Sequence, residues 1–254
     1  MYDNGMYATL GYAFLKTETV SSNTREISSD IFDGNPIVVD PNNPRVSNAI
    51  YGNRHRIIGT MNKTWTYGDA DKWSTTVSLF YEAAQGGRFS YTYAGDANGD
   101  GSFLNDLIYI PTPNELQTYQ FSGNAQQHEA QRNAFENFIS QDTYLKDRRG
   151  QYAERYANLS PWFSRLDIRV LQDLNLMGNQ SVQFSMDILN FGNLFNNSWG
   201  VREGVNNTQP ISIAVDPATQ IPTYTFDESQ TSSFVDDFSL NSRWQIQFGI
   251  RYNF

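Results

Sequence analysis

The sequence predicts an all-β protein, a segment of a transmembrane antiparallel β-barrel, from the period of its strands, the aromatic ends of their apolar faces and the lengths of the loops. Residues 244–254 alternate between large apolar side chains and polar or glycine residues. This two-residue period indicates a strand with one apolar and one polar face. The apolar face reads Trp244, Ile246, Phe248, Ile250 and Tyr252. Aromatic residues flanking an apolar stretch are typical of strands that cross lipid, whereas an edge strand of a soluble sandwich is the alternative.

Composition excludes several classes of protein. The 254 residues contain no stretch near the roughly 18 apolar residues of a membrane helix. The absence of cysteine excludes disulfides, thiol catalysis and cysteine-based zinc sites. A net charge of −9 argues against a nucleic-acid partner.

Five further segments share the period of two and predict five more strands. Their apolar faces are Met6 to Phe14, Ile57 to Tyr67, Trp73 to Tyr81, Leu166 to Val170, and Val182 to Ile188. In the second segment, Ile58 and Lys63 interrupt the alternation. Charged residues on the opposite faces predict contact with water or a plug, and hence a lumen.

Short and long connections alternate along the chain. The short ones are Gly68–Lys72 and Met177–Gln180, and the long ones are about residues 20–52, 85–161 and 193–240. All long loops should therefore emerge on one side, as the extracellular loops of outer-membrane barrels do, with the C-terminus in the periplasm. Acidic residues between Asn196 and Leu240 predict a solvated third loop.

Six strands are too few to close a barrel of this class, which needs about eight. We therefore expect residues 1–254 to be the C-terminal part of a larger barrel. The first residues lack the features of a signal peptide, so we expect a mature chain or a piece of a longer one. The final apolar residues, Phe248, Ile250, Tyr252 and Phe254, are predicted to serve as a C-terminal signal for membrane insertion.

The central loop contains the pattern D-x-N-x-D-G at residues 96–101. Oxygens at alternate positions of this pattern can converge on calcium. The bidentate glutamate expected at the twelfth position is replaced by Leu107, although Asp106 could substitute. Calcium bound by Asp96, Asn98, Asp100 and Asp106 and a plain turn cluster both remain open.

The same loop contains a helix-like stripe and a basic-aromatic patch. Residues 130–139 predict an amphipathic helix whose apolar side seals a small core within the loop. Candidate contacts for an extracellular ligand are Arg148, Arg149, Tyr152, Tyr156 and Trp162, with Arg155 beside them. Pairing of these arginines with Asp147 and Glu154 is the alternative.

We expect no enzyme activity. The two histidines, His55 and His128, lack the i, i+4 partner of a metalloprotease helix. A histidine-carboxylate hydrolase assembled from distant residues is the alternative.

Several segments together resemble the C-terminal barrel of TonB-dependent outer-membrane receptors, in particular the Oar-like group. The resemblance covers most of the chain from the second strand onwards. It is carried by R-H-R at 54–56, T-T at 75–76, L-F-Y-E at 79–82, F-S-Y at 89–91, G-D-A-N-G-D-G at 95–101, N-D-L-I-Y-I-P at 105–111, R-G-x-Y-x-E-R at 149–155 and D-I-L-N-F-G-N-L at 187–194.

This resemblance implies a 22-stranded barrel that is blocked by an N-terminal plug and opened by the TonB complex to import a bound ligand. The plug and the TonB box would lie outside residues 1–254. Expected partners are outer-membrane lipid, the rest of the barrel and plug, the TonB complex and an extracellular ligand. An outer-membrane adhesin or structural surface protein that transports nothing is the rival function.

Overall fold

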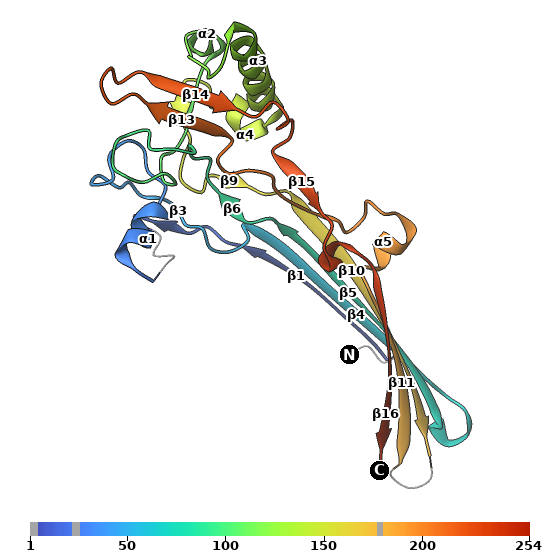
Figure 1. The fold of residues 1–254 in the computed structure, drawn as a ribbon. Coiled ribbons are helices and arrows are strands. Elements are labelled where there is room, and N and C mark those ends of the chain that lie inside the picture. Colours follow the sequence, from blue (N-terminus) through green and yellow to red (C-terminus); the bar gives the residue numbers. More distant parts are fainter. Residues whose placement is uncertain (1–4, 22–25, 177–179) are drawn as a thin grey trace.

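The computed structural model describes residues 5–21, 26–176 and 180–254, and its main feature is one antiparallel sheet. Six strands pair in chain order (Figure 1), which confirms the all-β prediction and each predicted strand. They are β1 (Met6–Phe14), β4 (His55–Tyr67), β5 (Trp73–Gln85), β10 (Trp162–Asn175), β11 (Ser181–Leu189) and β16 (Gln245–Asn253). The sheet is open, with β1 and β16 as its edges. No helix within the described ranges is long and apolar enough to span a membrane.

The register places apolar side chains mainly on one side of the sheet and charged side chains mainly on the other. One row that crosses all six strands contains only apolar residues: Ala8, Met61, Leu79, Ile168, Ile188 and Ile246. The neighbouring row points to the opposite side and reads Tyr7, Asn62, Ser78, Arg169, Asp187 and Gln247. Since side chains alternate along each strand, the sheet has an apolar face and a polar face, named here after these two rows.

The apolar face is largely open. Leu10, Phe248 and Ile250 are 80%, 72% and 75% exposed. The two irregular residues of the second strand are true exceptions: Lys63 lies on the apolar face between Met6 and Val77, and Ile58 lies on the polar face opposite Glu82. The ammonium group of Lys63 lies 5.6 Å from the ring centre of Trp65, which offers the cation a cation-π contact.

The polar face has charged side chains in ion pairs between neighbouring strands. The Arg56 guanidinium lies 2.8 Å from Glu82, which is nearly buried. Arg169 of β10 pairs with Asp187 of β11, its direct neighbour in the register. Opposite charges on facing residues stabilise an antiparallel pair, so the charged side chains of this face stabilise the strand pairing.

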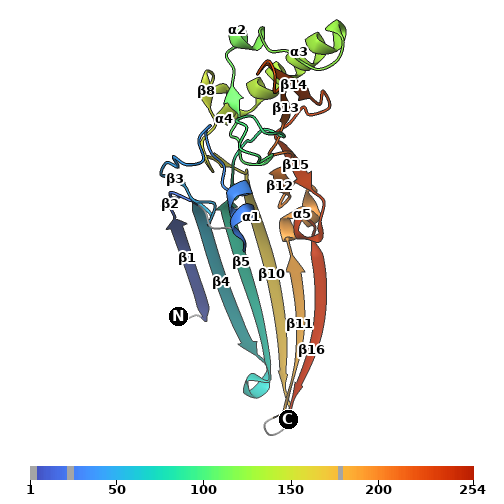
Figure 2. The ribbon, with the colours of Figure 1, turned by 60° about the vertical axis from the view of Figure 1, so that its left-hand side comes forward.

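The long connections all lie at one end of the sheet (Figure 2). They are the first loop (residues 15–54), the central loop (86–161) and the third loop (190–244). At the other end, residues 68–72 connect β4 to β5 through η1 (Asp69–Asp71). The second predicted short turn falls mainly on residues 177–179, outside the described residues.

Short elements organise the loops. The first loop contains β2 (Glu18–Thr19), α1 (Ser28–Asp33) and β3 (Ser47–Asn48). The central loop contains β6 (Arg88–Phe89), β7 (Tyr109–Ile110), α2 (Pro113–Leu116), α3 (Ala125–Gln141), α4 (Thr143–Lys146), β8 (Gln151–Tyr152) and β9 (Asn158–Leu159). The third contains α5 (Phe191–Phe195), β12 (Arg202–Val205), β13 (Ile211–Val215), β14 (Pro222–Phe226), β15 (Phe234–Asp237) and η2 (Leu240–Ser242).

The main hydrophobic core lies in the loops and not against the sheet. Its buried members include Tyr91, Ile108, Ile110, Phe121, Phe135, Phe138, Ile139, Leu145, Ile211 and Phe226. The central and third loops both contribute, so together they form one packed unit, called the cap. The predicted mini-core is confirmed, but it is shared between two loops.

The helix and the third loop differ from their predicted extents. The helix α3 begins at Ala125, five residues before the predicted start, because Asn124 and Gln127 form a capping box. In the third loop, β13 pairs with β14 and places Ile211 and Phe226 in the core. The sequence analysis did not predict this hairpin, because the acidic residues of the stretch indicated a solvated loop. The acidic side chains themselves are exposed or half-buried, as predicted.

Asp142 joins the two loops of the cap. One carboxylate oxygen accepts hydrogen bonds from the Tyr144 and Leu145 backbone N–H groups and caps α4. The other accepts from the Tyr91 hydroxyl at 2.8 Å and from Ser233 of the third loop at 2.5 Å. Burial and the Asp142 charge raise the pKa of Tyr91, so its hydroxyl stays protonated and able to donate.

The cap should depend on Phe138, which is 2% exposed and contacts Phe226 at a ring-centre distance of 5.6 Å. Phe138→Ala should lower cap stability by about 3–5 kcal/mol because it leaves a cavity. Amide hydrogen exchange should show loss of protection in α3 and β14, with the sheet unchanged. Phe103→Ala is the control, since Phe103 is 64% exposed. Equal protection in both variants would contradict a shared core.

Candidate functional site: a cavity between the first and central loops

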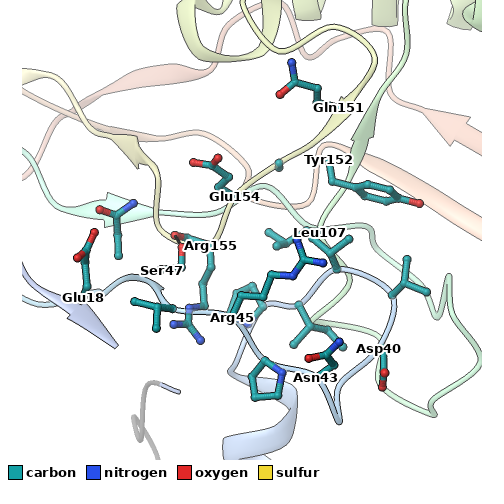
Figure 3. A pocket seen from close by; sticks show the side chains of 18 of the residues that line it. Glu18, Asp40, Asn43, Arg45, Ser47, Leu107, Gln151, Tyr152, Glu154 and Arg155 are labelled. Atoms are coloured by element: carbon teal, nitrogen blue, oxygen red, sulfur yellow. Dashed lines mark hydrogen bonds between the residues drawn. The ribbon is translucent and has the colours of Figure 1, made fainter. Parts of the chain in front are cut away.

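A cavity of about 710 Å³ lies between the first loop and residues 148–155 of the central loop. Figure 3 shows Arg45 and Ser47 on the first-loop side and Tyr152, Glu154 and Arg155 on the other. The apolar part of its lining comes mainly from Ile37, Val38, Val39, Pro44, Val46 and Leu107. Cavities of this size are typical of small-molecule sites.

Arg155 fixes the first loop to the central loop. Its guanidinium donates to the carbonyl oxygens of Thr19 and Val20 and to the Asn35 side chain. The backbone oxygen of Arg155 accepts from the Ser47 hydroxyl at 3.0 Å. Arg155 is buried and has no carboxylate partner among the described residues, and burial lowers its pKa. Its role is therefore structural, although it also forms part of the cavity lining.

A second contact between the first and central loops positions the apolar wall of the cavity. Ile37 forms a parallel bridge with residues 105–107, through its N–H to the Asn105 oxygen and its oxygen to the Leu107 N–H. Val39 has a φ of 61° at the centre of a turn in which the Asp40 N–H donates to the Val38 oxygen. This conformation is strained for a β-branched residue. The Asn98 side chain donates to the Val39 oxygen at 2.8 Å and helps to hold it.

The five predicted ligand contacts do not form one patch. Arg148 and Tyr152 line the cavity. Arg149 instead pairs with Glu136 of α3, Tyr156 is buried with its hydroxyl donating to the Gly34 oxygen, and Trp162 stacks on His55 at the loop end of the sheet. The expected pairing with Glu154 occurs for Arg148, at 2.8 Å. Ligand binding by these residues stays a prediction.

Arg45 is a cavity residue that was not among the predicted ligand contacts. It lies in the cavity lining, exposed, and within the described part of the chain its guanidinium makes no hydrogen bond or ion pair. Arg45 lies in P-R-V, which matches no binding motif, so no sequence signal distinguished it from an ordinary surface residue.

The predicted calcium residues form a tight turn cluster. Asp96 accepts from the N–H groups of Gly99, Asp100 and Gly101 at 2.7–3.1 Å. Asp106 accepts from the Ala97 N–H at 2.7 Å. Among the described residues, no group of three acidic or histidine side chains is placed to hold a metal ion. The turn accounts for these bonds, and calcium stays a prediction.

Neither the family models, nor the curated proteins, nor the solved structures contain a match to this chain. Function is therefore inferred from the residues and the geometry described above.

Asp106 should make cap stability depend on pH. Burial raises its pKa from 3.8 to about 6, with Asp100 and Asp96 adding to the effect and the Ala97 N–H opposing it. Between these values the folded state keeps a proton that the unfolded state loses, so stability falls as pH rises. We expect a loss of about 1–2 kcal/mol. Hydrogen exchange, corrected for intrinsic pH dependence, should detect it, and Asp106→Asn should remove it.

Calcium binding would reverse the direction of this pH dependence of cap stability, because a bound cation favours the charged carboxylate. If calcium binds, the cap should become more stable with rising pH in its presence, and Asp100→Ala should abolish the difference. The same pH profile with calcium and with a chelator would support the turn alone.

Proposed function

We propose that this chain forms part of the barrel wall of a TonB-dependent outer-membrane receptor, which binds a ligand at its extracellular loops and admits it to the periplasm. The observation that carries the proposal is the sheet itself. It has one uncovered apolar face, while the main core lies elsewhere. Such a surface is unstable in water but matches the lipid-facing side of a membrane barrel.

Aromatic residues border both ends of the apolar face. At the loop end, Phe14 and Trp162 lie on either side of His55, with ring centres 5.2 and 5.9 Å from its own. At the other end, Tyr67 pairs with Trp73 in the row that ends at Tyr252. Such rows fit the two interfaces of a bilayer.

The distance between the aromatic borders fits a bilayer. The strand β4 has 13 residues, or about 40 Å at roughly 3.3 Å per residue. A tilt of about 40° reduces this to about 30 Å along the membrane normal. The hydrocarbon core of a bilayer is about 30 Å thick.

The two edges of the sheet need further strands to pair with in a membrane. The strands β1 and β16 each have one side without a sheet partner among the described residues, and in lipid each unsatisfied backbone group costs several kcal/mol. We propose that other strands of the same barrel pair with both edges. The polar face, with Arg56, Glu82, Arg165 and Asp187, would then face a lumen occupied by water or a plug.

Topology within the membrane follows from the loops. We propose that the cap is extracellular and that β16 ends in the periplasm, in line with the long outer loops and short inner turns of this class. The plug and the TonB interaction are assigned by resemblance alone. No covalent chemistry is proposed, and the rival adhesin would use the same cap without a lumen that opens.

The membrane proposal can be tested by adjacent substitutions on β16. Phe248→Arg places a charge on the proposed lipid face and should cost about 2–4 kcal/mol at mid-bilayer depth, which should lower the amount of inserted protein several-fold. Gln247→Arg places the same charge on the polar face and should be tolerated. Heat-modifiable gel mobility of outer-membrane fractions measures the amount of inserted protein for both variants. Equal tolerance of the two variants would contradict the proposed orientation.

Import can be distinguished from adhesion by labelling, because residues 1–254 contain no cysteine and the full-length protein without an added cysteine gives the background rate. Ser78→Cys lies on the polar face and Val77→Cys on the apolar face of β5. In the full-length protein in cells, a membrane-impermeant maleimide should label Ser78→Cys faster when the inner membrane is energised, because the plug then moves. An uncoupler should lower that rate several-fold, with little labelling of Val77→Cys. A rate unaffected by the uncoupler would favour the adhesin.

A further inference from the structure

We infer that the cavity between the first and central loops binds a ligand with one carboxylate on an apolar body, and that Arg45 is the residue that contacts the carboxylate. This inference rests on the proposed receptor function and names the class of ligand that the receptor takes. It is carried by the unpaired guanidinium of Arg45, the charge balance of the lining and the apolar wall beside it.

The charge balance of the cavity differs from that of the whole chain. The protein has a net charge of −9, yet the lining includes Arg45, Arg148 and Arg155. Two of its acids are already paired: Glu154 with Arg148 at 2.8 Å, and Glu18 with Lys16 at 3.0 Å. The third, Asp40, accepts the Asn42 N–H and has no ion-pair partner among the described residues.

The three arginines of the lining therefore balance its three acids in formal charge, and Glu18 is paired with Lys16 outside the lining, which leaves Arg45 and Arg155 opposite Asp40 alone. Arg155 cannot serve the ligand directly, because both of its terminal nitrogens donate to the first loop and the residue is 4% exposed. Arg45 is exposed, and its side chain extends toward Leu107 within the cavity (Figure 3). A guanidinium offers a planar pair of donors that matches a carboxylate.

The wall near Arg45 is apolar. Val38, Val39 and Val46 are 44%, 56% and 66% exposed, and all three line the cavity. The strained turn at Val39 is held by Asn98. Strain of this kind persists where the surrounding structure enforces it, and it clusters at binding sites. An apolar ligand body would cover these valines and remove their surface from water.

The test uses two carboxylates with matched uncharged amides. N-acetyl-trileucine is compared with its C-terminal amide, and octanoate with octanamide, so that a peptide body and an acyl body are distinguished. Isothermal titration calorimetry is performed at pH 7.5 on the full-length protein in lipid nanodiscs, with empty nanodiscs subtracted. At least one carboxylate should bind about tenfold more tightly than its amide, as expected for a charge-assisted hydrogen bond.

Arg45→Gln should reduce this carboxylate preference to near one, and Arg45→Lys should retain part of it. Arg243→Gln removes an exposed arginine outside the cavity and should leave the preference unchanged. No binding of either carboxylate, equal binding of acid and amide, or a preference that survives Arg45→Gln would overturn the inference. Heat-modifiable mobility of the same samples tests the membrane proposal separately, so the two failures are distinguishable.

Discussion

The register of the six-stranded sheet is the constraint on which the rest of the structure depends. A slip of one residue in any of its pairings would move every side chain of the displaced strand to the other face. In the pairing of β10 with β11, either Arg169 or Asp187 would then enter a row of apolar residues, and their ion pair would be lost. The pairing is therefore specified twice, by the apolar row and by the charged row beside it.

The core and the sheet have separate roles. In a soluble protein the apolar face of a sheet usually provides the core, whereas here the buried side chains gather in the cap. The strands provide rigid supports, and the cap provides its own stability through aromatic packing and through Asp142, which binds Tyr91 and Ser233. This division explains how loops as long as residues 86–161 remain ordered without resting on the apolar face.

The sequence predicted the features that repeat and missed those that depend on distant contacts. Alternation located all six strands, because each has to present two different faces along its whole length. The start of α3 was misplaced because the polar first turn lacks an apolar stripe, although Asn124 and Gln127 carried a capping signal. Arg45 and Arg155 could not be assigned, since their roles depend on residues more than 100 positions apart, such as Arg155 and Thr19.

The two walls of the cavity are loops that end at neighbouring strands of the sheet. One wall belongs to the connection between β1 and β4, and the other to the connection between β5 and β10. At their base these walls cannot separate, because β4 and β5 pair continuously from Arg56 to Tyr67. Any adjustment to a ligand must therefore occur above the sheet, at the bonds of Arg155 and the bridge at Ile37. The contacts above the sheet also include the hydrogen bonds from Asn98 to Val39 and from Tyr156 to Gly34, and neither of these bonds belongs to the cap core or to the strand register.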